Sequence, residues 1–170
     1  RGTPLLLIAA GLQDPGNLGT LVRSAEAFGA TGVLTTPGTV SAWNQKALRA
    51  SVGSVFRVPV AGVSADDVRG LKRRGVRVFA AVGSADARTE SAIDADFAGG
   101  CGVMIGNEGA GLGAEWMELA DARVTIPCPG PVESLNAAVA GSLLLYEASR
   151  QRAALRFTHR YKTAPSEATR

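Results

Sequence analysis

Two short segments of the chain combine polar side chains with a sharp backbone turn, which is what a ligand site needs. In Gln13–Arg23 a Pro-Gly turn follows an apolar run, and Asn17 opens a helical pattern. Arg23 lies six positions after Asn17, and a guanidinium there suits a phosphate or a carboxylate. In Met104–Gly113 the glycines leave backbone N–H groups open to a ligand, and Glu108 carries the only charge. Both segments also have a plainer interpretation, in which Asn17 and Glu108 cap helices and Arg23 is a surface residue.

A third segment, Ile126–Ala140, joins a strand pattern to a long helical pattern. Its loop holds three prolines in five residues, and because proline fixes φ we expect a stiff connection. Ser134 and Asn136 fall where the helix is expected to start, so a hydroxyl can cap it and an amide can reach a ligand. A proline-stiffened loop before a capped helix is the structural alternative.

The residue inventory excludes several common chemistries. His159 is the only histidine and lies near the C-terminus, so neither a metal-ligand set nor a Ser–His–acid triad can form in the usual way. The chain has no GxSxG elbow and no GxxxxGK[ST] phosphate loop. Gly109, Gly111 and Ala114 match a dinucleotide-binding pattern, but the next strand pattern ends in Ile126-Pro127 without an acid for a ribose.

The bulk composition is that of one soluble globular domain. Of the 170 residues, 46% are hydrophobic and 19% are charged, and no apolar run reaches the roughly 18 residues that a membrane helix needs. Cys101 and Cys128 are isolated, which favours a cytoplasmic protein with free thiols. The chain begins with Arg1 and has no signal-peptide pattern, so we expect a fragment that lacks an N-terminal part.

Basic residues gather in two stretches, although the net charge is only +3. One lies between Arg69 and Arg77, and the other between Arg150 and Lys162, where no acid interrupts it. Such clusters suit a phosphate backbone. Solvated helix faces and a flexible tail explain them equally well.

Apolar runs alternate with helical patterns, which predicts an α/β domain with a mostly parallel sheet. Strands are predicted at Leu5–Ala10, Gly32–Thr35, Val55–Val60, Val76–Val82, Cys101–Ile105 and Arg123–Ile126. Helices are predicted from Asn17 to Gly29, Trp43–Ala50 capped by Ser41, from a Ser64/Asp67 capping box to Arg74, Ala114–Leu119 and Ser134–Ala153. Ser84–Asp96 is predicted to be a loop.

Taken together, the three segments resemble the motifs of the SpoU/TrmH family of the SPOUT superfamily, which are RNA ribose 2′-O-methyltransferases. The resemblance covers Leu5–Arg152 and is carried by DPGNLGTLVRSAEAFGA, IGNEGAGL and IPCPGPVESLNAAVAGSLLLYEASRQR. It implies a homodimer whose parallel six-stranded sheet is flanked by helices and ends in a C-terminal trefoil knot. The catalytic domain would be residues 1–156, with a basic flexible tail over 157–170 and an N-terminal RNA-binding extension missing.

The same resemblance implies S-adenosyl-L-methionine as the cofactor and no metal, because the leaving group is a neutral thioether. It assigns cofactor binding to Val82, Gly83, Gly106, Ile126, Pro127 and Leu135. It assigns catalysis to Arg23, Asn17, Glu108, Ser134 and Asn136. Guanidinium is not normally deprotonated, so we interpret Arg23 as a phosphate anchor that stabilises the developing alkoxide. Glu108 or a nearby phosphate then takes the proton.

Two alternatives to ribose methylation stay open. One is a related enzyme that methylates a base nitrogen, and the other is an RNA-binding protein that keeps the fold without activity. The ordered set of polar motif residues favours the ribose. We expect ribosomal RNA as the substrate first and transfer RNA second, and the charge pattern does not separate them.

Overall fold

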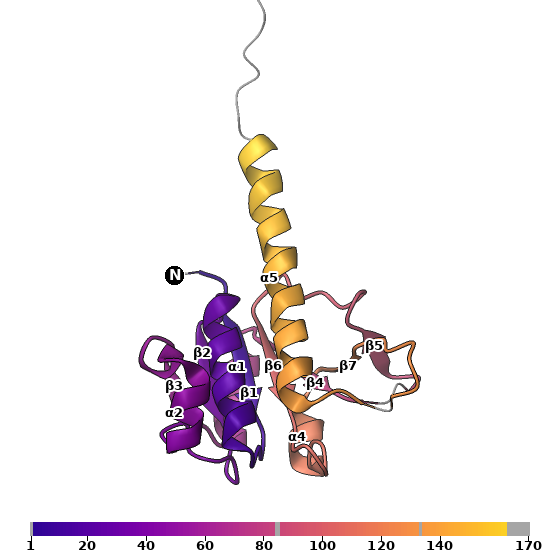
Figure 1. Cartoon of the computed structure of the whole chain (residues 1–170). Coiled ribbons are helices and arrows are strands. Elements are labelled where there is room, and N and C mark those ends of the chain that lie inside the picture. The colour runs from indigo at the N-terminus through magenta and orange to yellow at the C-terminus, as the bar shows by residue number, and fades with distance from the viewer. Residues whose placement is uncertain (1, 84–85, 133, 163–170) are drawn as a thin grey trace, which may run out of the picture.

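The computed structural model describes residues 2–83, 86–132 and 134–162, with 156–162 described by their backbone alone. Its middle layer is a parallel sheet with the strand order β3-β2-β1-β6-β4-β7-β5 (Figure 1). The strands are β1 (Leu5–Ala9), β2 (Gly32–Thr35), β3 (Val60–Gly62), β4 (Arg77–Ala81), β5 (Thr89–Ser91), β6 (Cys101–Ile105) and β7 (Ala122–Thr125). The helices are α1 (Pro15–Ala27), α2 (Gln45–Ser51), the 3-10 turn η1 (Ser54–Phe56), α3 (Ala65–Arg73), α4 (Ala114–Leu119) and α5 (Ala137–Lys162).

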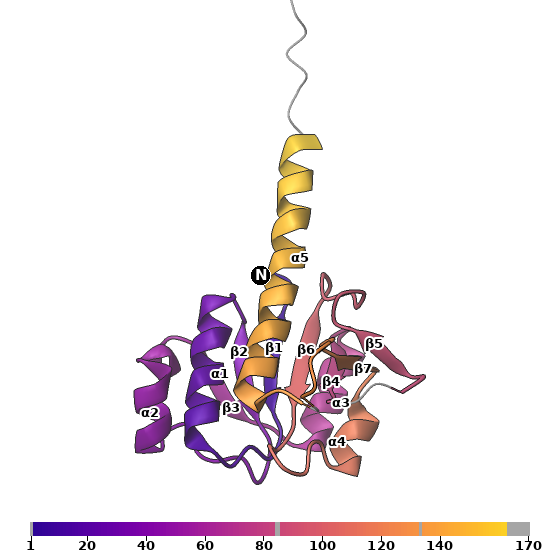
Figure 2. The ribbon, with the colours of Figure 1, turned by 45° about the vertical axis from the view of Figure 1, so that its right-hand side comes forward.

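Helices cover both faces of the sheet, and this is why its central strands are apolar throughout. Figures 1 and 2 show α1, α2 and α5 on one face and α3 and α4 on the other. Successive strand residues point to opposite faces. Leu7 and Val103 therefore pack under α1 and α5, whereas Ile8 and Met104 pack under α3 and α4. The predicted α/β class is confirmed.

The prediction of six strands is wrong, because the sheet has a seventh strand at one edge. β5 lies inside Ser84–Asp96, which the sequence predicted to be a loop. It consists of three residues, all polar, and so it gives no apolar pattern. It pairs only with β7, and the ion pair between Arg77 and Glu90, 2.7 Å long, ties it to β4.

Two helices begin at other residues than the sequence predicted. Asp14 caps α1 by accepting the Asn17 N–H at 2.8 Å, and Pro15 is the first helical residue. Asn17 therefore lies inside the helix, and its side chain is free for other contacts. Asn44, not Ser41, caps α2. The predicted strand Val55–Val60 is replaced by η1 and the short β3.

Other helix signals are confirmed. The side chains of Ser64 and Asp67 form the predicted capping box of α3. Gly29, with φ of +73°, follows the end of α1 as expected. The small residues at the start of α5 do allow close packing, because a Cβ built on Gly141 would overlap the Leu21 side chain and lie 3.1 Å from Ile105 Cγ1.

The helix α5 begins later and ends later than predicted. It starts at Ala137 instead of Ser134, and the Asn136 side chain accepts the Ala138 N–H at 2.9 Å. It continues beyond Ala153 to Lys162, into the range predicted as a tail, and residues 163–170 lie outside the described part of the chain. Within the described ranges, no helix is long and apolar enough to cross a membrane.

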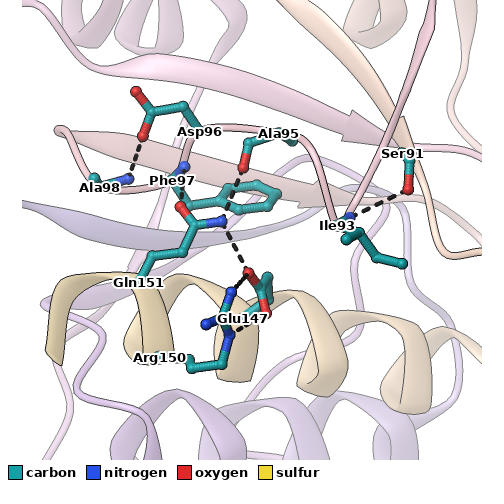
Figure 3. Close-up of polar contacts among 9 residues, drawn as sticks. All are labelled: Ser91, Ile93, Ala95, Asp96, Phe97, Ala98, Glu147, Arg150 and Gln151. Carbon is teal, nitrogen blue, oxygen red and sulfur yellow. Dashed lines mark hydrogen bonds and ion pairs between the residues drawn. The ribbon is translucent and has the colours of Figure 1, made fainter. Parts of the chain in front are cut away.

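Polar contacts hold the segment between β5 and β6 against α5 (Figure 3). The Gln151 side chain donates to the Ala95 carbonyl at 2.9 Å and accepts the Phe97 N–H at 2.8 Å. Glu147 receives a hydrogen bond from Gln151 and ion-pairs with Arg150. These contacts satisfy backbone groups that no strand pairs, and they fix α5 relative to this segment.

Val52 at the end of α2 has an unfavourable backbone conformation. Its φ of 49° and ψ of 41° are left-handed, which costs a β-branched residue about 1–2 kcal/mol. We expect Val52→Asn to raise the free energy of unfolding by roughly 1 kcal/mol, because asparagine tolerates this conformation. Denaturant unfolding checks this, with Ile93→Asn as a control at another exposed residue. An unchanged or lower midpoint for Val52→Asn would contradict the expectation.

Candidate active site

A cavity of about 450 Å³ opens at the carboxyl ends of β4, β6 and β7. This edge is where open parallel sheets bind ligands, and the volume is within the range of small-molecule sites. All residues to which the sequence analysis assigned cofactor binding line it, namely Val82, Gly83, Gly106, Ile126, Pro127 and Leu135. Glu108 and Ser134 line it as well. The cavity thus joins the second and third motif segments.

The loop after β6 closes tightly over Gly106. Asn107 and Gly111 exchange two backbone hydrogen bonds of 2.9 Å, which fold the loop back on itself. A Cβ on Gly106 would lie 2.5 Å from the Leu112 nitrogen and 2.6 Å from the Gly111 carbonyl oxygen, closer than real Cβ atoms approach. This position therefore requires glycine, and the cavity wall is built from backbone.

Asn107 organises this loop, although it was not among the residues predicted from the sequence. Its side-chain oxygen accepts the N–H groups of Gly109 at 2.9 Å and Ala110 at 3.1 Å. Its amide donates to the Gly11 carbonyl at 3.0 Å, which ties the loop to the segment after β1. An asparagine two residues before a glycine is a turn signal, and it could have identified this role.

Three of the residues assigned to catalysis form a chain of hydrogen bonds. The Asn17 amide donates to Glu108 at 2.9 Å, and the Asn136 amide donates to the Asn17 oxygen at 3.2 Å. The Asn17 side chain is available for these contacts because Asp14 caps α1. The pKa of the Asp14 carboxyl lies below its usual value, because this group accepts the Asn17 N–H and pairs with Lys46. The structure thus brings one polar side chain from each motif segment together beside the cavity.

Arg23 is not part of this cluster. It is exposed and does not line the cavity, and among the described residues its side chain has no hydrogen bond or ion pair. Six residues of helix place it roughly 120° around α1 and 9 Å along the axis from Asn17. Asn17 and Ser24 face α5, where Ser24 and Ser142 share a 2.7 Å hydrogen bond. Arg23 therefore points to solvent.

Most cations of the first basic stretch have acidic partners. Arg69 pairs with Asp66, and Lys72 pairs with Asp121 at 3.0 Å. Arg77 pairs with Glu90, as described above. Exposed Arg73 and Arg74 remain, but the end of α3 leads into the amino end of β4, opposite the cavity. This stretch therefore does not supply a phosphate-binding surface beside the site.

In the C-terminal basic stretch, two arginines are also engaged within the fold. Arg150 pairs with Glu147 at 2.7 Å. The Arg152 guanidinium donates to the carbonyls of Pro4 at 2.9 Å and Phe97 at 3.1 Å. The side chains beyond Leu155, including that of His159, lie outside the described ones. Arg150 is thus paired on α5 itself, and Arg152 ties α5 to the segments around Pro4 and Phe97.

Comparison with known proteins adds sequence relatives that are named for RNA methylation. The chain is 40% identical over 154 residues to the 23S rRNA (guanosine-2′-O-)-methyltransferase RlmB of Xanthomonas campestris, covering 89% of the chain and 61% of that protein. It is 41% identical to the 23S rRNA (guanosine(2553)-2′-O)-methyltransferase RlmP of Bacillus subtilis, covering 84% of the chain and 56% of that protein. The chain therefore spans about three fifths of the length of such relatives.

A solved structure and a family description agree with these relatives. The SpoU methyltransferase AviRb from Streptomyces viridochromogenes, in complex with AdoMet, superposes with a TM-score of 0.82 at 35% identity, over 90% of this chain and 59% of that one. Residues 4–146 match the family described as the SpoU rRNA Methylase family. This match covers most of the sequence and all three motif segments. The chain belongs to the SpoU rRNA methylase family.

Proposed function

We propose that this chain transfers a methyl group from S-adenosyl-L-methionine to a ribose 2′-hydroxyl of RNA, with ribosomal RNA as the first choice of substrate. The observation that carries the proposal is the Asn136–Asn17–Glu108 hydrogen-bond chain beside a cavity at the carboxyl ends of three strands. The names of the matched relatives and the AdoMet complex of AviRb support the same reaction and cofactor.

The residues around the cavity fit this cofactor. Ile126 and Leu135 offer apolar side chains to an adenosine, and the glycine-rich loop at Gly106 offers backbone N–H and C=O groups. Bound there, S-adenosyl-L-methionine supplies a methyl group on a sulfonium whose leaving group is a neutral thioether. No metal is then needed to stabilise a leaving group, so the protein has to position the ribose and accept a proton.

Glu108 is the proton acceptor in this proposal. Its carboxylate lines the cavity, and the Asn17 amide holds one oxygen at 2.9 Å, which leaves the other oxygen for the 2′-hydroxyl. Asn136 orients Asn17 from the start of α5. Ser134 lines the cavity, and we assign its hydroxyl a hydrogen bond to the ribose. In this proposal Glu108 and Ser134 touch the substrate, whereas Asn17 and Asn136 position Glu108.

We also propose that the chain acts as a homodimer. Val139, Leu143 and Tyr146 form an exposed apolar stripe on α5 at the four- and three-residue spacing of one helix face. Arg23 is exposed on the neighbouring α1. Packing this face against a second copy would bury the stripe and bring Arg23 toward the partner's cavity, where its guanidinium would anchor an RNA phosphate. Light scattering of a Leu143→Glu variant should then detect monomers; an unchanged dimer would oppose this arrangement.

A trefoil knot at the C-terminal end is a further part of the proposal. The contacts of Gln151 with Ala95 and Phe97, which hold the segment between β5 and β6 against α5 although α5 follows β7, support it. An experimental structure in which the chain before α5 passes outside this segment, without threading through it, would contradict the knot.

We also propose that the enzyme acts in the cytoplasm. Cell fractionation should then find it in the cytoplasmic fraction.

Calorimetry with S-adenosyl-L-methionine tests the proposal against a non-catalytic RNA-binding role. We expect saturable binding by the wild-type protein at one site per chain. Glu108→Gln should keep this binding, since the carboxylate acts on the ribose, and should lose methyl transfer by about a hundredfold or more. Undetectable binding at millimolar ligand would favour the non-catalytic alternative.

A further inference from the structure

An exposed pair of aromatic rings lies on the flank of the domain formed by α2 and η1. Trp43 is 59% exposed and Phe56 is 72% exposed, and their ring centroids are 5.8 Å apart at an angle of 53°. α2 lies beside α1, on the side away from α5 (Figure 1). The pair therefore belongs neither to the cavity nor to the apolar stripe on α5. Large exposed rings that touch each other suit a binding surface.

The backbone below the two rings is well anchored. Glu26 on α1 ion-pairs with Arg57, the residue after Phe56, and Arg57 also reaches Val52 at its carbonyl. This pairing lowers the pKa of Glu26 to about 2, so the carboxylate stays charged at neutral pH. Ser54 in η1 is buried. The backbone that carries the two rings is therefore held in place, so binding a ligand costs less conformational entropy of the protein.

The charges on this flank favour an anionic ligand. Arg49 is exposed on the outer face of α2, and within the described part of the chain its side chain has no hydrogen bond or ion pair. The nearby acids, Glu26 and Asp14, are each bound to a cation, Arg57 and Lys46. The flank thus combines aromatic rings, an unpaired guanidinium and neutralised carboxylates.

We propose that Trp43 and Phe56 stack unpaired bases of the RNA substrate and that Arg49 contacts the adjoining phosphates. The identity of the occupant rests on the proposed function of the chain. Single-stranded RNA is bound by aromatic faces combined with arginines, because every base has a stacking face and every nucleotide a charge. These three residues, the RNA platform, would hold single-stranded RNA that extends from the target nucleotide, at a distance from the methyl-transfer site.

Tryptophan fluorescence tests stacking directly. The chain has two tryptophans, and Trp116→Phe leaves Trp43 as the only reporter. We expect an unstructured oligouridylate to quench this emission saturably, whereas inorganic polyphosphate, which has charge but no bases, leaves it unchanged. Arg49→Ala should weaken the oligouridylate affinity and reduce its salt dependence. Equal effects of the two polymers, or no quenching at all, would overturn the platform.

Steady-state kinetics supply the second test. Trp43→Ala/Phe56→Ala should raise the KM for RNA roughly tenfold, with kcat at saturating RNA and S-adenosyl-L-methionine binding unchanged. Ile93→Ala, which truncates another highly exposed apolar residue, is the matched control and should change neither. An unchanged KM in the double variant would refute the proposal.

The outcomes also separate this proposal from the proposed function. If the wild-type protein methylates no RNA, the proposed function fails, while the fluorescence titration still decides whether Trp43 stacks bases. A change of oligomeric state in the double variant, measured by light scattering, would show instead that the two rings contact another copy of the chain, and it would overturn the RNA platform.

Discussion

Gly106→Ala should reduce the affinity for S-adenosyl-L-methionine by about a hundredfold or more. The added methyl group would lie 2.5 Å from the Leu112 nitrogen and 2.6 Å from the Gly111 carbonyl oxygen, so the loop after β6 must move by roughly 1 Å to an ordinary contact. That loop forms one wall of the cavity. A misplacement of about 1 Å costs on the order of a hundredfold in reaction rate, and we expect a loss of the same order in cofactor affinity.

The measurement is calorimetric titration of the variant with S-adenosyl-L-methionine, alongside circular dichroism to establish that the protein is folded. Gly113→Ala is the matched control from the same loop, because a Cβ at Gly113 meets no atom within 4 Å and Gly113 does not line the cavity. Its affinity should remain that of the wild type. If folded Gly106→Ala bound S-adenosyl-L-methionine with wild-type affinity, the cavity would not be the cofactor site.

Mixed dimers should show that Arg23 acts in the partner's site. We expect Arg23→Ala and Gly106→Ala homodimers each to lose at least about a hundredfold in methyl transfer, because one lacks the guanidinium and the other the cofactor site. In a mixed dimer of the two variants, the site with an intact Gly106 faces the intact Arg23 of the other chain. Such a dimer should regain about half of the wild-type activity per dimer, from one complete site out of two.

Two differently tagged variants, co-expressed and purified through both tags, supply this mixed dimer. If Arg23 served its own chain, each site of the mixed dimer would lack one component and the activity would stay at the level of the homodimers. Arg23→Lys separates charge from geometry, because a lysine keeps the charge but lacks the planar fork of donors. Near-normal turnover of Arg23→Lys with unchanged RNA affinity would rule out a specific role for the guanidinium.

The sequence was most informative where burial decides the structure. β6, buried at all five residues, and the capping box of α3 were predicted at their observed positions, because apolar runs and caps are local signals. β5 was missed because its three polar residues are fixed by pairing with β7 and by the Arg77–Glu90 ion pair. Pairing at a sheet edge depends on tertiary contacts, and no periodicity in the sequence records it.

For the candidate site, the residues were foreseen better than their arrangement. The residues that the family resemblance assigned to the cofactor do line one cavity, at the carboxyl ends of strands that the apolar pattern predicted. Asn17 was interpreted both as a helix cap and, from the family resemblance, as a site residue; Asp14 caps α1 instead, and Asn17 binds Glu108, a residue distant in sequence. Whether a polar side chain bonds locally or across the fold depends on the packed helices, so the sequence could not distinguish the two.

Methyl transfer to a ribose can be measured on ribosomal RNA itself. Ribosomal RNA from cells that lack the gene is incubated with the protein and S-adenosyl-L-methionine carrying a labelled methyl group, digested to nucleosides and analysed by mass spectrometry. We expect the label on the ribose of a 2′-O-methylnucleoside, reduced about a hundredfold or more with Glu108→Gln. Label on a base fragment, or no transfer to any RNA despite cofactor binding, would contradict it.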